Sequence, residues 1–316
     1  MRFIEGYMNG NAWEQLCIQC YKLRYQAVHY TEIPAAQGGD GGIEGFTTSG
    51  IVNQCYCPER AYSDDDLYKH QRDKMTVDIK KLLLLDYAKR LKSMGVPTIT
   101  EWHFVIPEYK DNRILIHAET KRTEVLQVKA NKPNDYYYIS DDFRIVIVDA
   151  KEFTAEIVRI IRTGLTDVKI NLAIQHTGTP DWSKCDSEKV ANIRRKICAV
   201  MHVEDTDDRL NLVVGLYVDY YVSGLEIMNS LRVDFPIVYE ELFKLEQSYK
   251  NEVKLKTLMN ADHKMNQSIF DAILNEFQSK LEKDFSRDLT QASVGELKQD
   301  LVASWLADCS MEFRSA

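Results

Sequence analysis

In the first half of the chain, segments whose hydrophobic residues recur with the period of a helix are interspersed with segments that have the pattern of a strand. The helical period predicts helices at residues 11–28, 64–93, 113–130 and 153–162. Extended patterns predict strands at residues 43–46, 51–57, 102–107 and 143–149. This order of elements predicts an α/β domain over residues 1–165, in which helices flank a mixed sheet.

The second half of the chain has a different pattern. Residues 166–185 contain Gly178 and Pro180 and lack a regular period, which indicates a linker. Beyond it the period is helical, with helices expected at residues 186–202, 206–232, 236–262, 266–283 and 294–308. We therefore expect an all-α domain over residues 186–316. Its apolar stripes serve either its own core or a contact with a partner or a second copy.

Composition and charge narrow the classes of function. Of the 316 residues, 45% are hydrophobic and 28% are charged, which is typical of a folded protein. No apolar run approaches the ~18–20 residues that span a bilayer, and the first ten residues have no secretory pattern. We therefore expect a cytoplasmic protein without a membrane partner. The net charge of −8 requires any DNA-binding surface to be a local basic patch, or to be completed by a partner or an oligomer.

Cysteines form two close pairs in the sequence. Cys17 and Cys20 lie in an expected helix, and Cys55 and Cys57 lie in an expected strand. The odd total of seven argues against a full disulfide framework. Packing in the core is the favoured role because cysteine is readily buried, and a zinc site made of the four thiolates is the alternative.

Acidic and amide side chains gather around a glycine-rich turn. Residues 38–46 contain Asp40 and Glu44, and the next expected strand contains Gln54. Side chains alternate along a strand, so Gln54 and Tyr56 share one face. Carboxylate oxygens bind the hard divalent ions that assist phosphodiester hydrolysis, and the glycines let the backbone approach a phosphate. These residues therefore indicate a metal-dependent phosphodiesterase site.

The same residues resemble the motif of the PD-(D/E)xK nucleases, the restriction-endonuclease-like superfamily, and in particular its Mrr-like branch. In that branch an acid on an upstream helix precedes Asp-Gly-Gly-Ile-Asp, and Gln-x-Lys follows a hairpin. Glu14 matches the helix acid, and Gln54 matches the Gln. Asp40 matches the first acid, and Glu44 stands in the position of the acid that opens the second strand. The resemblance covers roughly residues 11–107.

This resemblance implies a DNA endonuclease that uses Mg²⁺ or Mn²⁺. Asp40, Glu44 and Gln54 would hold the metal. Glu14 would complete the metal's shell or act as a base.

One residue departs from the family motif. The Lys that normally follows two residues after the Gln is Tyr56 here. Its substitute in an active nuclease would be Lys74, which shares an inward stripe of the next helix with Gln71, or else Lys69. The alternative is an inactive nuclease fold that serves in DNA binding or in complex assembly.

The layout of the whole chain, with a nuclease-like first half and a helical second half, resembles effector subunits of bacterial anti-phage systems. These are the Lamassu-type and related ABC three-component systems. The resemblance implies ATPase partners of the structural-maintenance-of-chromosomes kind, self-association on activation, and double-stranded DNA as the substrate. An acidic chain with little DNA affinity of its own is consistent with such an assembly.

Overall fold

The computed structural model describes residues 4–5, 9–34, 42–172, 186–308 and 310–314. Packing contacts divide the chain into two units. The first contains Gly6–Asp167, and the second contains Val168–Ala316 together with Arg2–Glu5. The first unit holds the sheet, and the second is mostly helical, as the sequence predicts at this coarse level.

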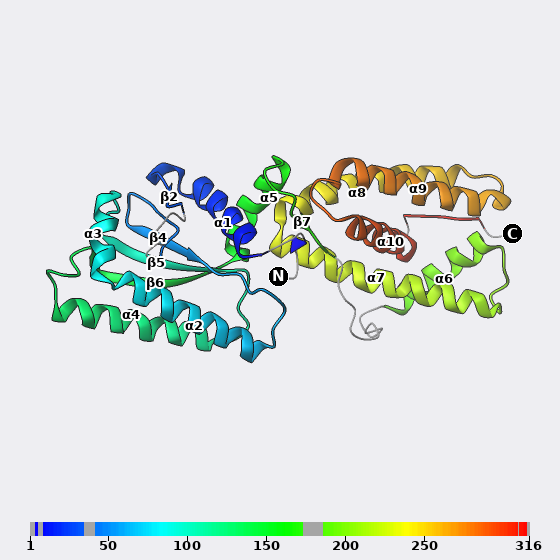
Figure 1. The fold of residues 1–316 in the computed structure, drawn as a ribbon. Coiled ribbons are helices and arrows are strands. Elements are labelled where there is room, and N and C mark those ends of the chain that lie inside the picture. Colours follow the sequence, from blue (N-terminus) through cyan, green and yellow to red (C-terminus); the bar gives the residue numbers. More distant parts are fainter. Residues whose placement is uncertain (1–3, 6–8, 35–41, 173–185, 309, 315–316) are drawn as a thin grey trace. The chain divides into compact units, whose positions relative to one another are not determined.

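In the described residues, the sheet of the first unit has five strands in the order β2-β3-β4-β5-β6. Their bounds are β2 Thr31–Glu32, β3 Gly45–Phe46, β4 Ile51–Cys55, β5 Ile99–Ile106 and β6 Ile139–Asp149. β2, β3 and β4 pair antiparallel, whereas β4, β5 and β6 pair parallel. The mixed sheet that the sequence predicts is therefore confirmed (Figure 1), and the short strand β2 is an addition to it.

Helices cover both faces of this sheet (Figure 1). They are α1 Gly10–Arg24, α2 Asp64–Leu82, α3 Leu85–Ser93, α4 Arg113–Asn131 and α5 Thr154–Arg162. Val52 and Phe104 of the sheet share one hydrophobic core with Met75 of α2 and Ile114 of α4. On the opposite face, the indole of Trp13 in α1 donates a hydrogen bond to a carbonyl of β5. Each helix therefore buries one apolar stripe, which is the usual source of helix stability in a domain.

Several helix bounds differ from the sequence-based predictions by a few residues, and contacts accompany two of the differences. The first helix begins at Gly10 and is capped by Asn9, whose side chain accepts a hydrogen bond from Ala12 N at 2.8 Å. The helix predicted at residues 64–93 is wrong in one respect, because it is broken into α2 and α3. The hydroxyl of Tyr138 donates to the main-chain oxygen of Leu82 at 2.7 Å, which satisfies a carbonyl at the end of α2.

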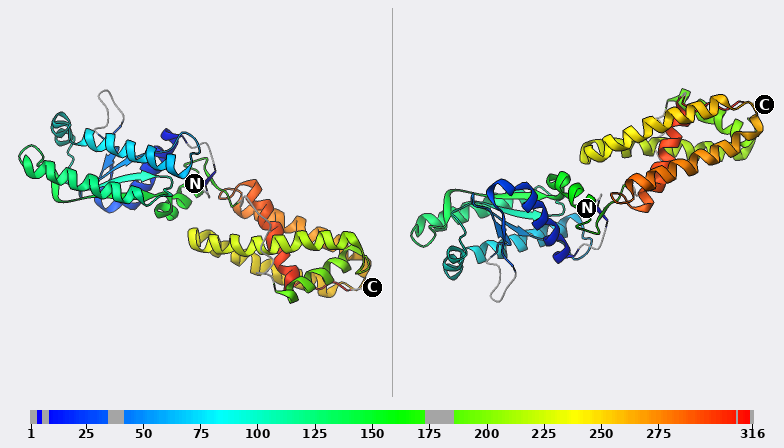
Figure 2. Two further views of the ribbon diagram at one scale, coloured as in Figure 1. Left: turned by 90° about the horizontal axis from the view of Figure 1, so that it is seen from below. Right: turned by 90° about the horizontal axis from the view of Figure 1, so that it is seen from above.

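The second unit contains the helices α6 Ser187–Met201, α7 Asp208–Asp234, α8 Pro236–Met259, α9 Asn266–Phe285 and α10 Gln291–Ala307. α10 lies between α7 and α9 (Figures 1 and 2) and supplies the most buried stretch of this core. Strand β1 Ile4–Glu5 pairs antiparallel with β7 Lys169–Ile170, so within its described residues the unit is helical apart from this small ribbon. Among the helices that the structure describes, none combines the length and the apolar character that crossing a bilayer requires.

Candidate functional site

The structure brings Glu44 and Gln54 into direct contact. Gln54 Nε2 donates to Glu44 Oε1 at 2.8 Å, and the main-chain N–H of Cys55 donates to Glu44 Oε2 at 2.9 Å. Glu44 is 6% exposed and Gln54 is 2% exposed. We call Glu44, Gln54 and the main chain of Cys55 the Glu44–Gln54 site. A buried carboxylate held by two donors has a fixed orientation, which a binding site requires.

The hairpin of β3 and β4 places the two side chains together. Glu44 N donates to the main-chain oxygen of Asn53 at 2.7 Å, which sets Glu44 beside the end of β4. The hairpin turns at Gly50, whose φ of +92° suits glycine. Just before Glu44, the main-chain oxygen of Gly42 accepts a hydrogen bond from the Trp102 indole at 3.0 Å. The backbone is therefore fixed on both sides of Glu44.

The amide of Gln54 lies where oxygen atoms converge. Its Nε2 is within 2.8 Å of Glu44 Oε1 and 3.4 Å of the main-chain oxygen of Cys55. Its Oε1 is buried and has no hydrogen-bond partner among the described residues. The two ends of an amide are interchangeable by a half-turn, and here that turn would direct three oxygens at one point. A hard divalent ion is one partner that suits such a set of oxygens, so the residue types at this point fit such an ion.

Asp40 and Glu14 are the other two acids of the predicted site. Asp40 lies outside the described residues. Glu14 lies on α1 and is partly buried. Burial raises the pKa of the Cys17 thiol, and the charges of Glu44 and Glu14 also raise it. Both carboxylates act on this one buried thiol, and Glu14 stays a predicted member of the site.

Lys74 is held in an ion pair on α2. Its Nζ lies 2.8 Å from Asp78 Oδ2, and Lys81 Nζ lies 3.2 Å from Asp78 Oδ1. Asp78 is fully buried, whereas the Lys74 side chain is 30% exposed. Within the described part of the chain, no ion pair joins Lys74 to Glu44. Lys74 is therefore the counter-ion of Asp78 in this structure. To act at the Glu44–Gln54 site, it would have to break this ion pair.

The other predicted residues of α2 are distributed along the helix. Lys69 lies on the surface and pairs with Asp65 at 2.7 Å and with Asp66 at 3.3 Å. Gln71 is buried, and its amide donates to the main-chain oxygen of Glu108 at 2.7 Å. Lys69 is thus engaged near the start of the helix, and Gln71 anchors α2 to the segment that follows β5.

Tyr56 replaces the motif Lys with a flat, half-buried ring. The ring stacks on Phe104 with centroids 6.3 Å apart and an angle of 8° between the planes. Burial raises the pKa of Tyr56 to about 12, and Tyr62 contributes to this increase. Its hydroxyl therefore remains protonated at neutral pH and supplies no charge to the site.

The opposite face of the sheet carries a buried polar chain that the sequence did not reveal. Tyr21 Oη lies 2.7 Å from His103 Nδ1, and His103 Nε2 lies 2.9 Å from Glu101 Oε2. Burial lowers the pKa of His103, although Glu101 opposes this change. Tyr21 is completely buried, so a substrate cannot reach it and the chain joins α1 to β5. Only the identity of His103 within an apolar strand gave a signal in the sequence.

The cysteines that the structure describes are free thiols. Cys17, Cys20 and Cys55 are buried, and Cys57 is partly buried. In the described ranges, no three side chains of His, Cys, Asp or Glu are grouped so as to hold a metal ion. The four thiols therefore pack in the fold, and the zinc alternative lacks a ligand group among these residues.

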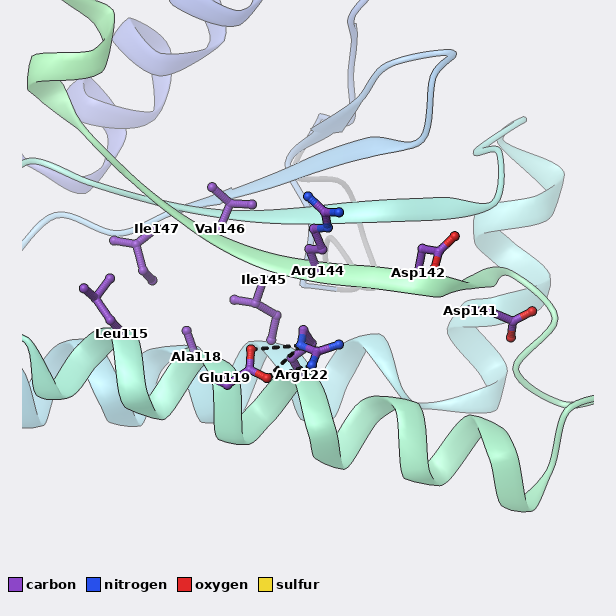
Figure 3. Close-up of a pocket in the computed structure, with 10 residues that line it drawn as sticks. All are labelled: Leu115, Ala118, Glu119, Arg122, Asp141, Asp142, Arg144, Ile145, Val146 and Ile147. Atoms are coloured by element: carbon purple, nitrogen blue, oxygen red, sulfur yellow. Dashed lines mark hydrogen bonds and ion pairs between the residues drawn. The ribbon is translucent and has the colours of Figure 1, made fainter.

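A separate groove of about 680 Å³ lies between α4 and β6. In Figure 3, Ile145 and Ile147 point from β6 toward α4, and Val146 points away. Glu119 and Arg122 on α4 neutralise each other in an ion pair at 2.7 Å. β5 separates β6 from β4, and no residue of the Glu44–Gln54 site lines this groove.

Comparisons with protein-family models, with curated proteins and with solved structures find no match to this chain. The function must therefore be inferred from the chemistry of the Glu44–Gln54 site itself.

Proposed function

We propose that this chain is a metal-dependent endonuclease that hydrolyses phosphodiester bonds of DNA at the Glu44–Gln54 site. The observation that carries the proposal is the convergence of a buried carboxylate, an amide with an orphaned oxygen and a main-chain carbonyl. Such a set of oxygens is suited to Mg²⁺ or Mn²⁺. The resemblance to the PD-(D/E)xK nucleases agrees with this chemistry.

Glu44 and Gln54 are the residues that would hold the ion. Glu44 keeps its orientation through the N–H of Cys55, and Gln54 would present Oε1 after a half-turn of its amide. Asp40 and Glu14 would add to the ligands or position a water molecule for attack. A bound divalent ion activates water and neutralises charge on the scissile phosphate.

Lys74 is the residue that would stabilise negative charge on the phosphate. To do so it must leave Asp78, and Lys81 reduces the cost of that step because it remains within 3.2 Å of the same carboxylate. The buried Asp78 therefore keeps a counter-ion when Lys74 turns toward a substrate. Lys69 is less suited because its two acidic partners hold it at the surface.

Plasmid nicking and linearisation with Mg²⁺ or Mn²⁺ tests this proposal. The native chain should cut, Glu44→Gln should lose at least about 100-fold in rate, and Lys74→Ala should lose roughly as much. Lys81→Ala is the matched control, because it removes the other ammonium from Asp78 and should still cut. No cutting by the native chain with either ion and at high protein concentration would contradict the proposal. Equal losses of cutting rate in Lys74→Ala and Lys81→Ala would contradict the role of Lys74 but leave the rest of the proposal in place.

One observation favours a second candidate function, an inactive nuclease fold that binds DNA or assembles a complex. Tyr56 carries no charge where the motif has Lys, and Lys74 is engaged by Asp78. An inactive subunit of this kind would bind DNA equally well before and after the Glu44→Gln substitution and would never release cut product.

We further propose that the chain acts as the effector of an anti-phage complex. The sequence layout suggests this role, and the net charge of −8 favours a DNA groove that is completed by further copies or by partner subunits. Cutting that rises steeply with protein concentration, or on addition of an ATPase partner encoded beside it, is the expected behaviour. Cutting at a rate strictly proportional to the concentration of the isolated chain would contradict it.

A further inference from the structure

A row of aromatic rings leads from the core of the sheet toward the surface beside Gln54. Trp102 stacks on Phe104 with centroids 5.7 Å apart and planes at 14°. Phe104 stacks on Tyr56 at 6.3 Å and 8°. Tyr56 follows Gln54 by two residues, on the same face of the chain, so their Cα atoms are about 7 Å apart along the extended backbone.

The surface beyond Tyr56 carries a second stack. The rings of Tyr62 and His70 are 4.3 Å apart, and the guanidinium of Arg60 lies 5.3 Å from the centroid of the Tyr62 ring. Arg60 and His70 are exposed, and Tyr62 is partly exposed. We call these three residues the edge stack. Tyr62 follows Tyr56 by six positions along the chain, so a short segment joins the edge stack to the aromatic row.

Asp64, Asp65 and Asp66 near the edge stack have cationic partners, whereas Glu59, which directly precedes Arg60, is exposed. Asp64 pairs with Lys110 at 3.4 Å, and Lys69 lies 2.7 Å from Asp65 and 3.3 Å from Asp66. Among the described residues, Arg60 makes no ion pair, and its contact is with the Tyr62 ring. A flat cation that rests on an aromatic ring, and makes no ion pair within the described ranges, is therefore available here.

We propose that the edge stack binds an unpaired base of single-stranded or locally unwound nucleic acid, next to the phosphodiester held at the Glu44–Gln54 site. A base can stack on Tyr62 or His70 only when it is not stacked between its neighbours in a duplex. Arg60 adds a cation–π contact and meets the adjacent phosphate. This inference rests on the proposed nuclease function, because it gives the substrate of the same site.

The edge stack could instead have a purely structural role, in which its side chains cover the first turns of α2. A control variant must distinguish this role from base binding. Tyr137 provides a matched control. It is 47% exposed, and Lys92 Nζ lies 5.3 Å from its ring centroid, so it too is a surface aromatic residue with a cation on it. It adjoins Tyr138, which bonds to the far end of α2, remote from the edge stack.

The test is fluorescence anisotropy with the full chain, Ca²⁺ in place of Mg²⁺, and three labelled probes. These are a thymidine DNA strand, a DNA duplex of the same length and an RNA strand of matching sequence. The DNA strand should bind more tightly than the duplex. Tyr62→Ala and His70→Ala should each weaken its binding roughly 5- to 100-fold. Tyr62→Phe should restore binding, and Tyr137→Ala should leave it unchanged. Thermal melts establish that the variants fold.

Equal affinity for the duplex and the single strand would overturn the inference, as would equal effects of Tyr62→Ala and Tyr137→Ala. Absence of binding to every probe would also overturn it. The RNA probe shows which nucleic acid the edge stack prefers. Tighter binding of RNA than of DNA would support base binding by the edge stack and would make RNA the substrate. If the strand binds through Tyr62 but the native chain never cuts, the nuclease proposal fails and only the binding of a base by the edge stack remains. If the chain cuts and Tyr62→Ala binds the strand as tightly as the native chain does, the inference about the edge stack fails and the nuclease proposal stands.

Discussion

Gly42 lies directly against the backbone of Asp78. A Cβ at Gly42 would be 2.5 Å from the main-chain oxygen of Asp78 and 3.2 Å from its carbonyl carbon. The φ of Gly42 is +80°, a conformation that disfavours other residues. This contact joins the segment before Glu44 to the helix that carries Lys74, so the two halves of the candidate site are positioned by one close approach.

Gly42→Ala should therefore destabilise the first unit more than an ordinary glycine substitution. Gly95→Ala is the matched control, since Gly95 has a φ of +79° and nothing within 4 Å of its added Cβ. The control should lose about 1 kcal/mol of unfolding free energy from its backbone conformation alone. Gly42→Ala should lose a further 1–3 kcal/mol or so from the clash. Urea denaturation measures both, and equal losses would show that α2 shifts freely away from Gly42.

The two lysines on Asp78 should be interchangeable for stability. Lys74→Ala or Lys81→Ala alone should cost under about 1 kcal/mol, because the remaining ammonium still faces the buried carboxylate. The double variant leaves that carboxylate uncompensated and should cost about 3–5 kcal/mol. Thermal unfolding of the three variants provides the comparison. If the loss of unfolding free energy in the double variant equals the sum of the two single losses, the buried charge of Asp78 does not require either ion pair.

The second unit should become less stable at high pH because of Asp300. This residue of α10 is 3% exposed, and its Oδ2 has no hydrogen-bond partner in the described ranges. Burial raises its pKa to about 8, and the charge of Glu296 adds to the increase. The folded state thus holds the proton more tightly than the unfolded state, whose carboxyl has a pKa of about 3.9. Stability is present below pH ~4 and declines as the pH rises through about 8.

Asp300→Asn should remove this dependence, because an amide of the same shape carries no charge. The variant should match the native chain near pH 4 and exceed it by about 1–3 kcal/mol of unfolding free energy above pH 8. Urea denaturation at both pH values measures the difference. An advantage of the same size at both pH values would contradict burial of a titrating carboxyl at this position.

The sequence predicted the elements of the fold well wherever a local pattern determines the structure. The contact of Glu44 with Gln54 follows from a hairpin of fixed register, so a short motif sufficed to find it. Apolar periodicity similarly placed α4 within one residue of its observed bounds and the end of β6 at Asp149, although β6 begins four residues before the predicted start.

Features that depend on distant contacts could not be found in this way. The break between α2 and α3 involves Tyr138, more than 50 residues away from Leu82. β1 pairs with β7 across most of the first unit, and such short strands have no pattern of their own. The helical period placed Lys74 and Asp78 on one face but gave no sign that they pair with each other rather than with Glu44.

Binding of Mn²⁺ tests the Glu44–Gln54 site most directly, because it needs neither a substrate nor a partner. Titration followed by electron paramagnetic resonance of free Mn²⁺ compares the native chain with Glu44→Gln and Gln54→Leu. Glu119→Gln is the control, since Glu119 is an exposed carboxylate paired with Arg122 outside the site. Loss of one ligand should weaken binding at least about tenfold in the first two variants and leave the control unchanged. Equal Mn²⁺ binding by the native chain and Glu44→Gln would contradict a metal centre at Glu44 and Gln54.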